Sequence, residues 1–244
     1  MPTRLILALT GADAESFLQG LTTNDMAGLG DGLVYTAMLT PQGKYLADFF
    51  VVRQDGKVIV DVAATLGDML KKRLTMYRLR ADVQIAASGL NLQRGTGHAP
   101  SGAWADPRHM ELGWRQYTNM PEADDGTDWD SIRVAHCIPE TGIELTPDTF
   151  ILEAGFELLH GVDFKKGCYV GQEVTARMKH KTELRKGLAR VSVSTLVPVG
   201  SEILANEKPV GTVFTQSGGY GIAFLRFDRV APEMTAGNAT VGRC

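Results

Sequence analysis

Residues 166–173, which read Lys-Gly-Cys-Tyr-Val-Gly-Gln-Glu, form the most distinctive stretch of the sequence. Cys168 follows a pair of lysines and precedes a helix that the pattern predicts from about Gly171 to His180. The positive end of a helix and the adjacent lysines both favour thiolate over thiol. We therefore expect Cys168 to have a lowered pKa and to act as a reactive or metal-ligating group. The alternative is a small apolar residue packed at a loop.

Polar residues around this cysteine each have two interpretations. Gln172 and Glu173 fall in the first turn of the predicted helix, where they either cap its N-terminus or take a direct functional part. Lys166 and Arg177 are able to attract an anionic partner group. The basic run over residues 177–190 is typical of a solvated surface.

Paired β-rich runs predict antiparallel sheets on both sides of this stretch. Two adjacent hairpins join residues 34–39, 45–52 and 57–62 through turns at residues 41–43 and 55–56. A further hairpin joins residues 210–215 to residues 220–227. Adjacent hairpins imply antiparallel pairing. After Lys186 only short strands follow, which predicts a small barrel or sandwich.

Helical periodicity is the second structural signal. It predicts helices over residues 12–21, over residues 65–77 with Thr65 as cap, from residues 128–130 onward, and over residues 150–160. Hairpins and helices without βαβ alternation indicate an α+β fold. We place a domain boundary near residue 186, which gives a large domain of residues 1–186 and a small one of residues 187–244.

Composition limits the classes of function. The chain of 244 residues is 44% hydrophobic and 22% charged, with a net charge of −3, so nucleic-acid binding is not expected. No apolar run approaches the roughly 20 residues of a membrane span, and the beginning of the chain has no signal-peptide pattern. We therefore expect a cytoplasmic protein without a membrane partner.

Cysteine and histidine usage narrows the metal chemistry. The three cysteines are Cys137, Cys168 and Cys244, an odd number that argues against a disulfide framework. An iron–sulfur cluster usually needs about four thiolates, so we expect no metal site within the chain alone. The five histidines lack metal-site spacing. A hydrolase with a cysteine nucleophile would need one of them as a nearby base, and this alternative stays open.

The stretch from Lys166 to Glu173, followed by Ala176-Arg177, resembles the signature of the YgfZ-type proteins. These are folate-binding members of the glycine-cleavage T-protein (aminomethyltransferase)-like superfamily. Weaker resemblance covers most of the chain. It runs through residues 17–25, residues 39–44 with Asp48, residues 77–80, residues 138–140, residues 209–211 and residues 220–226.

The resemblance implies a fold, a cofactor and a function. The fold is T-protein-like, with antiparallel sheets and helices around a central folate opening and a small C-terminal β-barrel. The cofactor is tetrahydrofolate or a derivative. The function is assembly or repair of iron–sulfur clusters in client enzymes, tRNA-modifying ones included, with an A-type iron–sulfur scaffold protein as partner.

Site residues follow from the same resemblance. The working motif comprises Lys166, Cys168, Tyr169, Gly171, Gln172, Glu173 and Arg177, and Cys168 is a candidate for a ligand shared with a partner. Folate contacts fall on Tyr35, Asp48 and Glu140.

Asp48 can be interpreted from its chemistry as well. A buried carboxylate beside an amine can stabilise a developing cation or accept a hydrogen bond from a pterin N–H, whereas an outward-facing strand Asp would be solvated. The aminomethyltransferase branch typically has two acids in a row where this chain has Ala47-Asp48. We therefore expect folate binding without conventional enzymatic turnover. A tetrahydrofolate-dependent aminomethyltransferase is the alternative.

Overall fold

The computed structural model describes residues 3–123, 125–180 and 184–244, which divide into two compact units. The first unit comprises Met1–Thr127 and Glu157–Val174, and the second comprises Asp128–Phe156 and Thr175–Cys244. Lys181, which belongs to the predicted basic run, lies outside the described residues.

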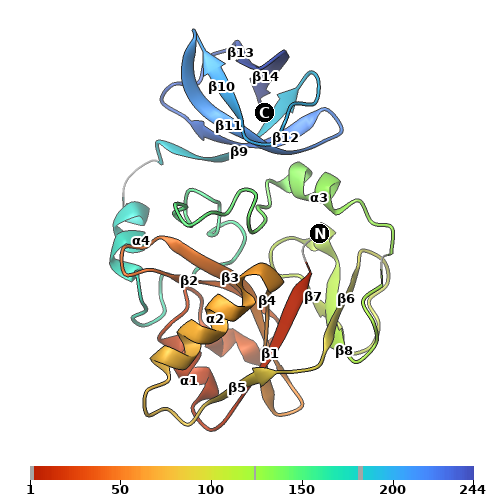
Figure 1. Cartoon of the computed structure of the whole chain (residues 1–244), viewed down its shortest axis with the longest axis vertical. Coiled ribbons are helices and arrows are strands. Elements are labelled where there is room, and N and C mark those ends of the chain that lie inside the picture. The colour runs from red at the N-terminus through yellow and green to blue at the C-terminus, as the bar shows by residue number, and fades with distance from the viewer. Residues whose placement is uncertain (1–2, 124, 181–183) are drawn as a thin grey trace. The chain divides into compact units, whose positions relative to one another are not determined.

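A five-stranded antiparallel sheet forms the centre of the first unit (Figure 1). Its order is β2-β3-β4-β1-β5, with bounds β1 Arg4–Thr10, β2 Val34–Leu39, β3 Tyr45–Gln54, β4 Lys57–Ala63 and β5 Gln84–Ala87. The two predicted hairpins of this region are confirmed, since β3 pairs with both β2 and β4. Asp55 and Gly56 turn the second hairpin with positive φ values of 51° and 73°.

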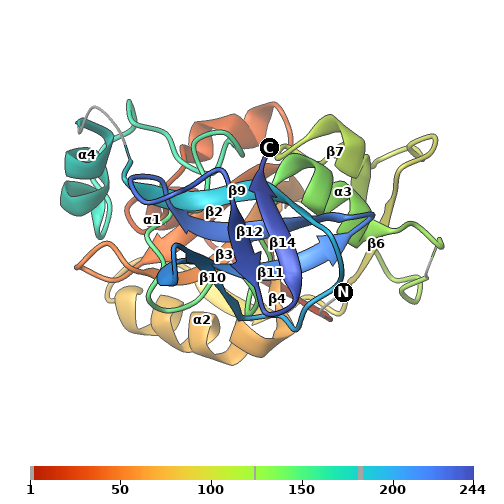
Figure 2. The same cartoon turned by 90° about the horizontal axis from the view of Figure 1, so that it is seen from above.

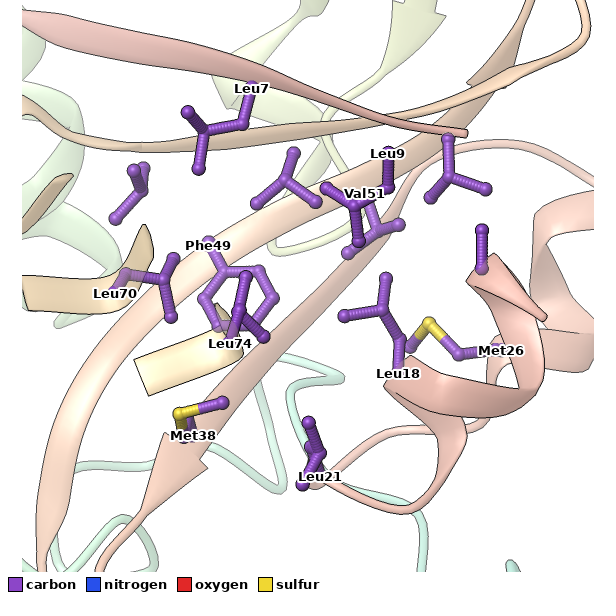
Figure 3. Packing of buried hydrophobic residues seen from close by; sticks show 14 of the residues in the cluster. Leu7, Leu9, Leu18, Leu21, Met26, Met38, Phe49, Val51, Leu70 and Leu74 are labelled. Atoms are coloured by element: carbon purple, nitrogen blue, oxygen red, sulfur yellow. The ribbon is translucent and has the colours of Figure 1, made fainter. Parts of the chain in front are cut away.

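One face of this sheet packs on helices. Side chains alternate along a strand, so Ala47, Phe49 and Val51 of β3 point into an apolar cluster that Leu70 and Leu74 complete (Figure 3). The helices are α1 (Ala14–Gln19) and α2 (Ala64–Tyr77), with a 3-10 turn η1 (Met26–Gly30). Burying these aliphatic and aromatic groups stabilises the unit by about 25 cal/mol per Å² of apolar surface.

The predicted helices at residues 12–21 and 65–77 are confirmed, but the predicted cap is wrong. The N-cap of α2 is Ala63 and makes no side-chain cap bond. The helix follows directly from β4, and the amide of Ala64 donates to the carbonyl of Thr3 at 2.8 Å. A backbone acceptor therefore does what the Thr65 hydroxyl was expected to do.

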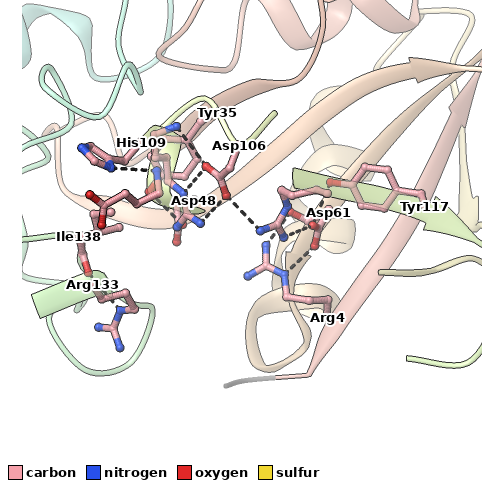
Figure 4. Close-up of polar contacts among 12 residues, drawn as sticks. Arg4, Tyr35, Asp48, Asp61, Asp106, His109, Tyr117, Arg133 and Ile138 are labelled. Carbon is pink, nitrogen blue, oxygen red and sulfur yellow. Dashed lines mark hydrogen bonds and ion pairs between the residues drawn. The ribbon is translucent and has the colours of Figure 1, made fainter. Parts of the chain in front are cut away.

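The opposite face of the sheet carries charge. Beside it lies a three-stranded sheet with order β6-β8-β7, whose bounds are β6 Asn91–Gly95, β7 Trp104–Ala105 and β8 Trp114–Thr118, together with a 3-10 turn η2 (Met110–Leu112). Asp61 of β4 is fully buried and accepts bonds from Arg4 Nε at 2.6 Å, Arg115 Nη2 at 2.6 Å and the Tyr117 hydroxyl at 3.0 Å (Figure 4). The carboxylate thus joins β4 to β1 and β8.

The ion pairs change the acidity of this carboxyl group. Burial alone would raise the pKa of Asp61, but the guanidinium groups of Arg4 and Arg115 lower it to about 2. Since the folded-state pKa lies below the unfolded one, its stabilising contribution is complete above about pH 4. That contribution is lost as the pH falls towards the folded-state pKa.

The second unit contains a closed barrel with the order β10-β11-β12-β9-β14-β13 (Figure 2). The bounds are β9 Lys186–Val193, β10 Ser201–Ala205, β11 Lys208–Ser217, β12 Tyr220–Arg226, β13 Met234–Ala236 and β14 Ala239–Arg243. Val191, Val213, Leu225 and Val241 fill its core. The predicted hairpin at residues 210–227 is confirmed by the pairing of β11 with β12.

Two further helices have the predicted places. In α3 (Trp129–His136), the Asp128 carboxylate caps the amide of Ser131. The helix α4 (Gln172–His180) follows the Cys168 stretch. The prediction of a helix over residues 150–160 is wrong. Residues 151–160 instead form successive turns, in which Gly155 and His160 have positive φ.

Replacing Asp61 by Asn tests the buried cluster. Asp61→Asn keeps the volume but leaves Arg4 without the Asp61 charge and Arg115 with the more distant carboxylate of Asp106, at 3.4 Å. We expect the free energy of unfolding at pH 7 to fall by about 3 kcal/mol in urea denaturation. Asp55→Asn, in an exposed turn, should change it by less than about 0.5 kcal/mol. Equal effects of the two substitutions would contradict this assignment.

Candidate functional site

Cys168 is exposed on a loop of the first unit, between Gly161 and the start of α4. Its neighbours Lys165 and Gly167 are exposed as well. The alternative of a cysteine packed in the interior is therefore wrong, because the thiol is open to solvent. Cys137 is half-buried, and burial together with the charge of Glu144 raises its pKa to about 12.

Lys166 anchors this loop. Only 7% of the residue is exposed, and its ammonium group donates to the backbone carbonyls of Gln19 at 2.7 Å, Thr22 at 2.5 Å and Asn24 at 3.0 Å. An ammonium group has three N–H donors, so all of them are used. Lys166 therefore binds the chain's own backbone. The sequence had suggested instead that its ammonium group faces an anionic partner.

The surroundings of this ammonium group lower its pKa. Burial brings the pKa of Lys166 down to about 8, against the opposing charges of Asp25 and Asp163. Its Nζ lies 5.1 Å from the ring centroid of Tyr169, which is itself 8% exposed. The buried Tyr169 ring thus lies beside the Lys166 ammonium group.

Asp163 and Thr23 hold the start of the loop. The Asp163 carboxylate accepts from the amides of Lys165 and Lys166. The amide of Asp163 donates to the carbonyl of Thr23 at 3.0 Å, and the Thr23 hydroxyl donates to the carbonyl of Gly161 at 2.7 Å. The backbone on both sides of Lys166 is therefore fixed.

Gly171 holds the end of the loop by close packing. Its φ is +85°, and a Cβ there would lie 2.6 Å from the carbonyl oxygen of Thr40. Across this contact, a Cβ on Gly43 would lie 2.8 Å from the Cβ of Val174. The two glycines let the Cys168 loop dock on the β2–β3 turn, which explains why both stretches carry glycine.

The remaining motif residues belong to α4. Gln172 begins the helix, and its amide donates to the carbonyl of Tyr169 at 3.2 Å. Glu173 lies in the first turn and Arg177 in the last, where their charges complement the helix dipole. Both are exposed.

Asp48 and Tyr35 meet on the charged face of the central sheet (Figure 4). Asp48 is 5% exposed and accepts from the Tyr35 hydroxyl at 3.1 Å and the Tyr45 hydroxyl at 2.6 Å. The solvated alternative for Asp48 is therefore wrong. Burial, then the negative charge of Asp48, raises the pKa of Tyr35 well above its ordinary value.

Arginine and aromatic side chains surround this pair. The Cζ of Arg108 lies 5.4 Å from the ring centroid of Tyr35 and 4.8 Å from that of Phe50. Asp106 pairs with Arg108 at 2.8 Å. Sequence reasoning missed Arg108 as a site residue, because Arg108 follows β7 in a stretch without strong periodicity.

A pocket of about 680 Å³ opens beside Tyr35, within the first unit. Its lining combines acceptor groups with aromatic and aliphatic surface. The polar and aromatic lining residues are Asn24, Asp25, Asp31, Tyr35, Trp104, His160 and Asp163. The volume lies in the range of about 300–1,000 Å³ that is usual for small-molecule sites.

Glu140 belongs to the second unit and is engaged there. Its carboxylate lies 3.2 Å from Nη1 of the buried Arg133, whose Nη2 donates to Glu144 at 2.6 Å. Contacts within the first unit thus bring Tyr35 and Asp48 together, and Glu140 takes part in an ion-pair network of the second unit.

Two wider searches cover the described part of the chain. Within residues 3–123, 125–180 and 184–244, three or more His, Cys, Asp or Glu side chains nowhere gather in a way that could hold a metal ion. Over the same residues, every helix is too short or too polar to cross a membrane.

The fold defines a class of protein. The chain superposes on the crystal structure of the glycine cleavage system aminomethyltransferase T from Bartonella henselae with a TM-score of 0.76. The match covers 98% of this chain and 82% of that one at 14% sequence identity. The fold is therefore T-protein-like, as the resemblance implied.

Sequence comparisons find relatives among iron–sulfur cluster assembly factors. Residues 185–242 match the family described as CAF17, C-terminal beta-barrel domain. The human iron-sulfur cluster assembly factor IBA57, mitochondrial, is 28% identical, over 93% of this chain and 76% of that protein. The IBA57 homolog of Mycosarcoma maydis is also 28% identical, over 79% of this chain, which spans 56% of the relative's length. Over most of its length the chain is thus similar to iron–sulfur cluster assembly factors of the IBA57 type, and its C-terminal barrel matches the CAF17 barrel family.

Thiol alkylation tests the different surroundings of the cysteines. At pH 7 we expect iodoacetamide to modify Cys168 more than about a hundredfold faster than Cys137, since the pKa of Cys137 is raised and a free thiol titrates near 8.5. Cys244, which is also exposed, provides the control for accessibility. Peptide mass spectrometry measures the rates. A Cys168 rate at or below that of Cys137 would contradict the exposed placement of the Cys168 thiol.

Proposed function

We propose that this protein binds a reduced folate and assists the assembly or repair of iron–sulfur clusters in client enzymes. The names of its relatives, the T-protein-like fold and the arrangement of the first unit support this proposal. The observation that carries it is the exposed Cys168, held on a loop that the buried Lys166 and the closely packed Gly171 fix in place.

Cys168 is the working group in this proposal. An iron–sulfur cluster is held mainly by thiolates, usually about four, and the chain has three cysteines. The cluster is cargo, and a partner would supply the remaining ligands. We infer that this partner is an A-type scaffold protein and that tRNA-modifying enzymes are among the clients. A cytoplasmic location belongs to the same proposal.

The first unit has groups that fit a reduced pterin. Its pocket is lined by Tyr35, by the aromatic residue Trp104 and by carboxylates that can accept ring N–H and amino hydrogen bonds. Asp48 would act through Tyr35, because its carboxylate fixes the Tyr35 hydroxyl. A bound tetrahydrofolate would supply one-carbon carrier chemistry; the protein's residues bind and orient its pterin end.

The aminomethyltransferase alternative is less well supported. Ala47 is fully buried and belongs to the apolar cluster on the helix side of the sheet. A second acid at this position would place an unpaired charge in a hydrophobic core, at a cost of several kcal/mol. The chain's own packing thus favours alanine and leaves Asp48 as a single acid.

Tetrahydrofolate binding can be measured by thermal stability. At about a hundred times the Kd, a ligand of the folded state adds about 2.7 kcal/mol of stability, so we expect Tm to rise by about 5 °C or more. Asp48→Asn should weaken binding about tenfold by releasing Tyr35, while the exposed Asp68→Asn should not. The folate proposal fails if millimolar tetrahydrofolate leaves Tm unchanged.

The role of Cys168 can be tested in a deletion strain. Cys168→Ser alters the side-chain volume little and lies at an exposed position, so we expect normal abundance but reduced activity of iron–sulfur client enzymes. Cys137→Ser is the matched control and should retain function. Client-enzyme activity and protein level are measured together. Full rescue by Cys168→Ser would refute a chemical role for the thiol.

A further inference from the structure

Asn24 joins the anchor of the Cys168 loop to the Tyr35–Asp48 pair. Its backbone carbonyl accepts from the Lys166 ammonium at 3.0 Å. Its side-chain amide donates to the carbonyl of Tyr35 at 2.8 Å and to the carbonyl of His160 at 2.7 Å. Tyr35 in turn donates its hydroxyl to Asp48. Hydrogen bonds, joined through the residues Asn24 and Tyr35 themselves, therefore link the Cys168 loop to the proposed folate site.

The pocket beside Tyr35 is walled by members of this same chain of bonds. Asn24, Tyr35, His160 and Asp163 all line it. Asp163 also accepts from the amides of Lys165 and Lys166. A molecule in the pocket would thus touch residues that fix the loop, although Lys166 and Cys168 do not line the pocket themselves.

The connecting segment has little room to yield. Thr22, Thr23 and Thr36 are fully buried. The Thr23 hydroxyl lies 3.3 Å from that of Thr36, which also accepts from the amide of Asn24 at 3.0 Å. A shift of Asn24 would break buried hydrogen bonds, each costing about 1–3 kcal/mol if left unmade. A displacement of the Cys168 loop would therefore disturb Asn24 and Tyr35, and a displacement of Tyr35 would disturb the loop.

The lining also indicates the chemistry of the occupant. Among the described residues that line the pocket, Asp25, Asp31 and Asp163 carry negative charge, whereas lysine and arginine are missing. Trp104, which is partly exposed, offers flat apolar surface. This combination suits a flat heterocycle with N–H and amino donors and disfavours a carboxylate tail.

We propose that Lys166 and Asn24 are positioning residues that couple occupancy of the Tyr35 pocket to the order of the Cys168 loop. This inference rests on the proposed function and extends it, because it makes the reduced folate a regulator of the loop that presents the thiol. The pterin end lies in the pocket and the glutamate tail outside it. By linkage, a ligand that favours the ordered loop binds more tightly when the loop is anchored.

The first test uses tetrahydrofolate as the probe and tryptophan fluorescence as the signal, since Trp104 lines the pocket. Lys166→Met keeps the length of the side chain but removes the ammonium group, and Lys165→Met is the matched control on an exposed neighbour. We expect Lys166→Met to raise the Kd about tenfold, equivalent to about 1.4 kcal/mol. Lys165→Met should leave the Kd unchanged. Lys166→Arg, which keeps donor groups, should recover part of the affinity.

The second test needs no substitution and gives a readout that a merely structural role would not move. Hydrogen exchange at the amides of Lys165 and Lys166 should slow about tenfold in wild-type protein saturated with tetrahydrofolate, while the barrel amides of β9–β14 remain unchanged. In Asn24→Ala the slowing should disappear even when ligand concentration restores saturation. Asn119→Ala, at an exposed asparagine outside the pocket lining, is the control.

The outcomes separate this inference from the function on which it rests. Tetrahydrofolate binding with unchanged exchange at the loop, or with equal Kd values for Lys166→Met and wild type, would overturn the coupling and leave the folate site standing. If wild-type protein binds no tetrahydrofolate, the folate part of the proposed function falls and takes the coupling with it.

Discussion

The structure around Cys168 depends on one buried ammonium group. The Nζ of Lys166 donates to the backbone carbonyls of Gln19, Thr22 and Asn24. Burying a charge is costly unless each of its hydrogen bonds is made, and the three donors of this group are all used. The arrangement holds two segments together that are more than 140 residues apart in the chain, as the separations of 147, 144 and 142 residues show. It leaves the Cys168 thiol exposed to solvent and the Lys166 side chain buried.

Everything proposed for the first unit builds on that constraint. The same segment that accepts from Lys166 continues to Asn24 and on to Tyr35, so the loop and the pocket share a wall. On the far side of Tyr35, Asp48 fixes the hydroxyl group, and further along the sheet Asp61 binds Arg4 and Arg115. The charged face of the sheet thus carries linked ion pairs and hydrogen bonds, and the opposite face packs an apolar cluster against the helices.

Turn chemistry made part of this fold predictable, and tertiary contacts decided the rest. Asp55-Gly56 marks a hairpin because few other residue pairs accept two positive φ values. In contrast, β1 has a continuous apolar run from Leu5 to Leu9, which periodicity alone does not assign to a strand. The sequence singled out Lys166 and Glu140 by resemblance. It could not indicate that Lys166 is buried on carbonyls or that Glu140 pairs with Arg133, since both facts depend on distant segments.

Titration of the lysine side chains by nuclear magnetic resonance tests the central claim most directly. With Cε and Hε shifts followed across the alkaline range, the account predicts that one lysine titrates near pH 8, while ordinary lysines titrate near about 10.4. The early signal should be missing in Lys166→Met and present in Lys165→Met. If every lysine titrates near about 10.4, burial does not lower the pKa of Lys166, and this description of the buried anchor is contradicted.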